Sequence, residues 1–177
     1  MKVIFVRHSE PDYSMLDKAN NPEAYVGFGR DLAPLTGHGR YLAQEAAKNP
    51  VFAQAQVLIS SSVTRALETA AYIARHHDLP LLVDPFFHEW RPDLDGLNYT
   101  EVELELAYTT YMTHGGDLPS DSPIRYETAA EMRTRFLKAL EKYRQYDTVV
   151  IVCHGMLMRQ FVAQEVIDYC ELFEVEL

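Results

Sequence analysis

The chain has 177 residues and a formal net charge of −10, and 47% of its residues are hydrophobic. This length favours one domain, residues 1–177, with one substantial core, and the ordinary hydrophobic content argues against disorder. The acidic balance, with a sequence pI near 5.1, argues against a nucleic-acid partner, which would need a basic face.

The apolar runs argue against a membrane or secreted protein. Lys2 is followed by only four apolar residues before Arg7, which is too short a run for a signal peptide. No apolar run approaches the length of a membrane span. The two cysteines, Cys153 and Cys170, do not suggest a disulfide framework and fit a reducing compartment. We therefore expect a cytoplasmic protein with no membrane partner.

The first elements are a strand, a loop and a helix. Residues 2–6 form an apolar, β-branched run that predicts a buried strand. After a loop expected over 27–34, Thr36 is a candidate N-cap for a helix over about 37–48. Gly39 is unfavourable inside the first turn of that helix, which indicates close backbone packing there.

Two more strands and an irregular segment come next. Residues 56–60 predict a second strand, and a helix is expected to begin near Ser62, where serines can cap it. Residues 80–83 predict a third strand. Prolines and paired glycines interrupt 91–125, which we interpret as an insertion that forms a lid, with a helix over about 100–112.

The last part of the chain completes an alternation of strands and helices. A long amphipathic helix is expected over 126–146, a strand over 147–152 and a helix from 155 to about 166. Residues 169–177 alternate apolar and acidic side chains, as an edge strand does. This pattern predicts an α/β fold, a three-layer α/β/α sandwich with a mainly parallel central sheet.

Three of the predicted strands end in polar clusters that carry cations. The clusters are Arg7-His8 after residues 2–6, Ser61 to Arg65 after residues 56–60, and Cys153-His154-Gly155 after residues 148–152. The carboxyl ends of neighbouring parallel strands lie side by side, and ligands bind there in open α/β sheets. Two histidines and two arginines would then meet, which predicts an anion site and suggests phosphoryl chemistry.

His8 is the candidate nucleophile of this site. A neutral imidazole nitrogen can attack phosphorus if the other ring nitrogen donates to a fixed acceptor. The alternative is a core histidine bonded to the backbone, which a lone histidine would favour. His154 occupies the equivalent place after another strand, and that coincidence favours function. A protonated His154 would donate to a phosphate oxygen.

Arg65 and Arg7 are the candidate phosphate-binding cations. Arg65 lies at a helix start, where free N–H groups and the helix dipole also favour phosphate. Its alternative is a surface ion pair with Glu68, three residues further on. Arg7 directly follows a buried strand, and guanidinium groups bind phosphate oxygens in a bidentate manner.

These motifs together resemble the histidine phosphatase superfamily, the phosphoglycerate mutase-like phosphatases. Arg7-His8-Ser9-Glu10 resembles the family's Arg-His-Gly-Glu motif, and Leu35-Thr36-Gly-His-Gly39 its Leu-Thr-x-x-Gly helix start. Residues 61–70 are similar to its Ser-x-x-x-Arg-Ala-x-x-Thr-Ala motif, and Cys153-His154-Gly155 to its Ser-His-Gly. His88-Glu89 resembles the segment with its acidic proton donor. The resemblance covers nearly the whole chain in the expected order.

The resemblance implies a role for each residue. His8 would form a phosphohistidine, while Arg7, Arg65 and His154 would hold the phosphoryl oxygens. Glu89 would protonate the leaving oxygen and then activate water; without the family it is one of 26 acidic residues, most of them expected at the surface. No metal or cofactor is implied, and the seven histidines lack paired metal-ligand spacings.

Departures from the family pattern favour a phosphatase over a mutase. Ser9 replaces a glycine and Cys153 a small hydroxyl residue, and Ser14 stands where the mutases have asparagine. The insertion is also short compared with that of the mutases. We expect Ser14 and Arg91 to face a small phosphorylated substrate or a phosphoprotein. For Arg91 and for Tyr13, a surface ion pair or ordinary packing is an equal alternative.

Three other functions remain alternatives. One is a phosphoglycerate mutase-type phosphotransferase, and another is a domain that binds a phosphorylated ligand without turnover. The third is a cysteine-dependent phosphatase, because Cys153 and Arg159 have Cys-x5-Arg spacing. The residues between them are bulky and apolar, unlike a loop of N–H groups around phosphate, so we expect Cys153 to be a packed thiol.

Overall fold

The computed structural model describes residues 1–14, 28–97 and 100–177. The described strands form a five-stranded sheet in the order β3-β2-β4-β1-β5. The strands are β1 (Lys2–Arg7), β2 (Val57–Ser61), β3 (Leu81–Asp84), β4 (Thr148–Cys153) and β5 (Leu172–Glu176). The first four run parallel, and β5 pairs antiparallel with β1 at one edge. The predicted mainly parallel sheet is confirmed, and the three polar clusters end adjacent strands.

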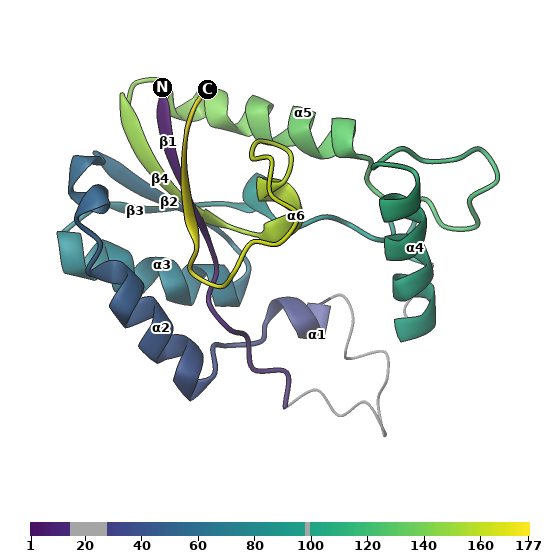
Figure 1. Cartoon of the computed structure of the whole chain (residues 1–177), viewed down its shortest axis with the longest axis horizontal. Helices are drawn as coiled ribbons and strands as arrows, with labels where there is room; N and C mark the ends of the chain where they lie inside the picture. The colour runs from purple at the N-terminus through teal and green to yellow at the C-terminus, as the bar shows by residue number, and fades with distance from the viewer. Residues whose placement is uncertain (15–27, 98–99) are drawn as a thin grey trace.

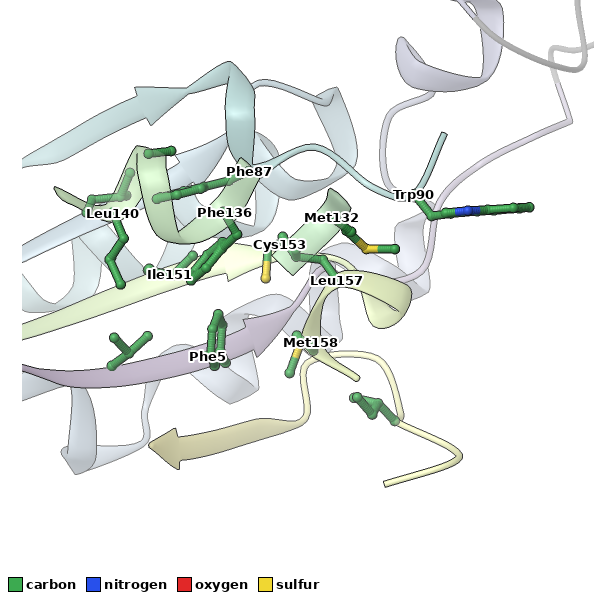
Figure 2. Close-up of a cluster of buried hydrophobic side chains, with 14 of the residues drawn as sticks. Phe5, Phe87, Trp90, Met132, Phe136, Leu140, Ile151, Cys153, Leu157 and Met158 are labelled. Atoms are coloured by element: carbon green, nitrogen blue, oxygen red, sulfur yellow. The ribbon is translucent and has the colours of Figure 1, made fainter. Parts of the chain in front are cut away.

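Helices cover both faces of this sheet (Figure 1). On one face, α2 (Gly37–Ala47) packs on α3 (Thr64–His77), and Ile73 of α3 joins a core cluster with strand residues such as Leu58. On the other face, α5 (Ala129–Leu140) buries Phe136 against Phe5 and Ile151 (Figure 2). Successive strand residues thus serve opposite cores, and the three-layer α/β/α fold is confirmed.

The start of α2 agrees with the sequence prediction. The Thr36 hydroxyl accepts a hydrogen bond from the Gly39 N–H at 2.7 Å, as an N-cap does. A Cβ atom on Gly39 would meet the carbonyl oxygen of Glu10, two residues beyond His8. Glycine therefore lets α2 lie directly against the segment that comes after β1.

Three predicted boundaries and one predicted cap are wrong. The loop over 27–34 contains a short helix, α1 (Phe28–Asp31); residue 27 lies outside the described residues. The helix expected near Ser62 begins at Thr64, but the predicted serine cap is wrong: the Ser61 hydroxyl accepts from the Val63 N–H, and no side chain among the described residues caps the helix.

The helix expected over 126–146 begins only at Ala129, where Thr128 and Glu131 form a capping box, and a 3₁₀ turn, η4 (Glu141–Tyr143), comes after α5. The helix expected to reach 166 ends as α6 (Gly155–Met158). Beyond this end, the partly buried Phe161 packs against Phe5 and Phe136, with ring centroids 5.6 and 4.7 Å away.

The segment over 91–125 carries α4 (Glu101–Thr113), which confirms the predicted helix. Figure 1 shows α4 apart from the sheet, at the opposite end of the molecule from α2. Its last turns are anchored by Tyr111, whose ring lies 5.2 Å from Trp90 and 5.8 Å from Tyr126. Lid motion of this segment stays a prediction.

The structure has two further 3₁₀ turns in its described residues, η2 (Pro50–Gln54) and η3 (Pro85–Phe87). No helix in the described residues is long and apolar enough to cross a membrane.

Candidate active site

A cleft of about 1100 Å³ opens at the carboxyl ends of β1 and β2 and the start of α6. Five of the seven predicted site residues line it, namely Arg7, His8, Arg65, Glu89 and Arg91. Their common location results from the strand order, because β4 lies between β2 and β1 and all three end at the same edge. The sheet therefore gathers cations that are far apart in the sequence, as the strand-end clusters predicted.

His8 has the hydrogen bonds that a nucleophilic imidazole needs. Its Nδ1 lies 2.7 Å from the carbonyl oxygen of Ser9, which can only accept, so Nδ1 carries the proton. Its Nε2 lies 3.2 Å from the Arg65 Nε–H and accepts from it. Burial, and then the charge of Arg65, lower the pKa of His8 well below its ordinary value. Nε2 therefore holds a lone pair at neutral pH.

Arg65 joins the helix start to this histidine. It lies in the first turn of α3 and is buried, and its NH1 group donates to the carbonyl of Arg30 at 3.3 Å. The alternative pairing with Glu68 is wrong, because Glu68 binds Arg40 at 2.6 Å and the Leu35 N–H at 2.7 Å. The Arg65 charge is thus directed at the cleft.

Arg7 is oriented by the C-terminal part of the chain. Its NH1 group donates to the carbonyl of Ile167, and its guanidinium lies 4.4 Å from the centre of the Tyr169 ring. Within the described residues its Nε atom is buried and has no hydrogen-bond partner. A Cβ atom on Gly155 would lie 3.6 Å from that Nε, so the start of α6 passes close to it.

His154 lies beneath the cleft, fully buried, with its ring centre 5.2 Å from that of His8. Its Nε2 lies 2.8 Å from the Ser61 hydroxyl, which accepts from the Val63 N–H. Among the described residues, His154 Nε2 is the acceptor within reach of the hydroxyl's own proton, so we assign the hydroxyl as the donor. This bonding leaves the proton of the imidazole on Nδ1, which is buried and without a partner among the described residues.

His154 does not need to be protonated to donate a hydrogen bond to a phosphate oxygen. Burial, and then the charge of Arg65, lower the pKa of His154 well below its ordinary value. The residue is a neutral imidazole at neutral pH, and its Nδ1–H is the donor.

Glu89 is held at the start of α6. Its Oε1 accepts from the N–H groups of Leu157 at 3.1 Å and Trp90 at 2.8 Å, and its Oε2 accepts from Met156 at 3.1 Å. The side chain is partly exposed and lines the cleft. The candidate acid is thus bonded to the helix that begins directly after His154.

Ser14 is not brought into the cleft. It is exposed, and both its N–H and its hydroxyl bond the Asp12 carboxylate. Arg91 lines the cleft, as does Tyr13, with Arg30 lying 4.9 Å above the centre of the Tyr13 ring.

The lining residues that sequence reasoning missed include Arg30, Arg159 and Tyr169. Arg159 lies four residues after Gly155, a helical spacing that could have placed it on the same side of α6. Arg30 lies in the four-residue helix α1 and Tyr169 in a turn, and both are too short to show a periodic pattern.

Cys153 faces away from this chemistry. Figure 2 shows its side chain in the core with Phe136, Ile151 and Leu157. Burial raises the pKa of the thiol well above its ordinary value, so a thiolate is disfavoured. The packed-thiol interpretation is confirmed. In the described residues, no group of three or more His, Cys, Asp or Glu side chains is arranged to hold a metal ion.

The histidine phosphatase superfamily (branch 1) model matches residues 3–168. The chain belongs to this superfamily. Among solved structures, it resembles Bacillus stearothermophilus YhfR with a TM-score of 0.73 and 21% identity, covering 99% of this chain and 91% of that one. No curated protein matches the chain significantly.

Two named phosphatases share the same fold. Mycobacterial glucosyl-3-phosphoglycerate phosphatase complexed with VO3 has a TM-score of 0.72 and 18% identity, covering 99% of this chain and 92% of that one. The alpha-ribazole phosphatase of Shigella flexneri has a TM-score of 0.61 and 20% identity, covering 89% and 76%. At these identities the likeness establishes the phosphoglycerate mutase-like fold.

Proposed function

We propose that this protein is a phosphomonoester hydrolase that works through a phosphohistidine on His8. One observation carries the proposal: in the described part of the chain, Arg7 Nε and His154 Nδ1 are both buried without partners. Arg7 directly precedes His8 in the chain, and the His154 ring centre lies 5.2 Å from that of His8. A buried N–H group without an acceptor costs about 1–3 kcal/mol. An anion next to the nucleophile would supply both acceptors, which supports a phosphoryl group as the ligand.

The first step transfers the phosphoryl group to the protein. The His8 Nε2 lone pair attacks phosphorus, and an N–P bond forms as the P–O bond to the leaving group breaks. The leaving oxygen takes that electron pair and a proton from the Glu89 carboxyl group. Arg7, Arg65 and His154 stabilise the three equatorial oxygens, over which the transition state spreads its charge.

The second step releases inorganic phosphate. Water attacks the phosphorus of the phosphohistidine, and the Glu89 carboxylate takes a proton from that water. The N–P bond breaks and returns its electron pair to His8 Nε2. Glu89 therefore acts first as an acid and then as a base. Neither step requires a metal ion or cofactor, so we propose a metal-independent enzyme. The two free cysteines fit a reducing compartment, which supports a cytoplasmic location.

Hydrolysis is favoured over transfer to a second substrate. The insertion over 91–125 is short, and two of the proteins with this fold are named as phosphatases. A mutase would share the first step, and a non-catalytic binding domain would share the anion site. We propose that Arg91 contacts the leaving group of a small phosphorylated substrate or phosphoprotein, because it lines the cleft two residues after Glu89.

Trapping the intermediate tests the proposal. Rapid mixing with p-nitrophenyl phosphate, an alkaline quench that preserves phosphohistidine, and mass spectrometry should locate the phosphoryl group on His8. Release of inorganic phosphate from a panel of phosphomonoesters, undiminished by EDTA, should accompany it. Phosphate bound to Cys153, or turnover that depends on an added divalent ion, would overturn the mechanism.

A further inference from the structure

Two charged residues, Glu127 and Arg135, form hydrogen bonds with the backbone of the segment that carries Glu89. We call them the clamp pair. The Arg135 Nε and NH2 groups donate to the two Glu127 carboxylate oxygens at 2.7 and 2.9 Å. Only 13% of the Arg135 side chain and 6% of the Glu127 side chain are exposed. This is a bidentate ion pair, the geometry that holds a guanidinium in one orientation.

The clamp pair bonds the backbone on both sides of Glu89. Before Glu89, the Arg135 NH1 group donates to the carbonyls of Phe86 and, at 3.2 Å, His88. After Glu89, the Glu127 carboxylate accepts from the Arg91 N–H at 3.3 Å.

The main chain of Glu127 adds a second set of bonds. Its N–H donates to the carbonyl of Arg91 at 2.9 Å, and its carbonyl accepts from the Trp90 indole at 2.7 Å. The residues next to Glu89 are thus fixed by the clamp pair, while the Glu89 carboxylate itself is fixed by α6.

Stability alone is a poor reason for this arrangement. A buried ion pair loses its hydration, and replacing both partners by apolar residues is often neutral or stabilising. The polar groups of the clamp pair instead converge on one short stretch of backbone, residues 86–91. Orientation of that stretch is a property that an apolar pair would not provide.

We infer that Glu127 and Arg135 are positioning residues that hold Glu89 where it protonates the leaving group. This inference rests on the proposed role of Glu89. A displacement of about 1 Å can lower the rate of a proton transfer or group transfer by about 10²-fold. Loss of the clamp pair should therefore affect substrates in proportion to their need for a proton.

The test compares two leaving groups in single-turnover phosphorylation of the protein. Glycerol 2-phosphate leaves as a basic alkoxide, whereas p-nitrophenol leaves readily as its anion. The variant that replaces both Glu127 and Arg135 by methionine removes the clamp pair without stranding a buried charge. It should raise the ratio of the p-nitrophenyl to the glycerol phosphate rate by up to about 10²-fold. Arg135→Lys, which keeps the charge but loses the bidentate guanidinium geometry, should raise this ratio less.

The matched control is Arg40→Lys, at the ion pair with Glu68 between α2 and α3. It should leave the ratio unchanged. In a Glu89→Gln background, where the ratio is already high, removing the clamp pair should raise it no further. Thermal unfolding of each variant identifies the variants that fold.

The outcomes separate the two proposals. If Glu89→Gln raises the ratio but no folded clamp variant does, the positioning role is wrong and the acid role stands. Equal slowing of both substrates would mean that the clamp pair is merely structural, and a further rise in the Glu89→Gln background would mean that it acts elsewhere. If the ratio is unchanged in Glu89→Gln itself, the acid role of Glu89 is wrong, and the positioning role of the clamp pair is wrong as well.

Discussion

A histidine comes directly after β1 and another directly after β4, at equivalent positions, but the two imidazole rings have different hydrogen-bond partners. Both His8 and His154 are buried, and burial lowers the pKa of each. His8 is bonded through Nδ1 to a backbone carbonyl, whereas His154 is bonded through Nε2 to the Ser61 hydroxyl. The first arrangement leaves a lone pair on Nε2, and the second leaves an N–H at Nδ1. The partner of the other nitrogen therefore determines which histidine attacks and which one donates.

The largest expected effect is the loss of turnover when the attacking histidine, His8, is replaced. His8→Ala removes the proposed nucleophile and should lower turnover by about 10⁴-fold or more, as loss of a catalytic nucleophile does in other hydrolases. Cys153→Ser, at the buried end of β4, should retain most of the activity. Steady-state assays with p-nitrophenyl phosphate measure both. Retained activity in His8→Ala together with its loss in Cys153→Ser would reverse the assignment.

Replacing the donating histidine, His154, should cause a smaller loss of kcat, and another hydrogen-bond donor at this position should restore part of it. His154→Ala should lower kcat by about 10²–10³-fold, the cost of one donor to a developing anion. His154→Asn places an amide N–H near the position of Nδ1–H and should recover part of that loss. If asparagine and alanine are equally poor, donation from Nδ1 is not the role of His154.

Anion binding should stabilise the folded protein through the same nitrogens. Inorganic phosphate or vanadate at about 100 times its Kd should add about 2.7 kcal/mol to the free energy of unfolding, which a rise in Tm measures. Arg65→Ala should weaken both this shift and competitive inhibition by the anion. Arg75→Ala, an exposed arginine on the same helix, is the control. Equal shifts in the two variants would place the anion away from the cleft.

The smallest effect concerns pH. Because burial keeps both histidines neutral, their folded pKa values lie below those of the unfolded chain, which binds protons near pH 6.5. This stability is present above about pH 6.5 and is lost as pH falls, by at most about 1.4 kcal/mol per pH unit for each histidine. His154→Asn should make the dependence shallower in denaturant unfolding between about pH 5 and 7. An unchanged slope would contradict a buried neutral His154.

The sequence by itself determined the strands and the polar clusters at their ends. Apolar β-branched runs and cap residues such as Thr36 act within a few residues, so the local pattern predicts the element. The meeting of His8, Arg65 and His154 at one edge could be predicted from the general topology of α/β sheets. Glu89 was different, since only the family resemblance singled it out from the other acids.

Tertiary structure alone decided how these groups are bonded. The tautomer of His154 depends on Ser61, 93 residues away, and Arg7 is oriented by the carbonyl of Ile167, 160 residues away. The clamp pair joins a loop residue to a helix residue, and nothing in their spacing identifies the backbone that they bind. Ser14 fails to reach the cleft because its polar groups bond Asp12 instead. Periodicity records which residues are buried, whereas the partner of a buried polar group depends on how distant elements pack together.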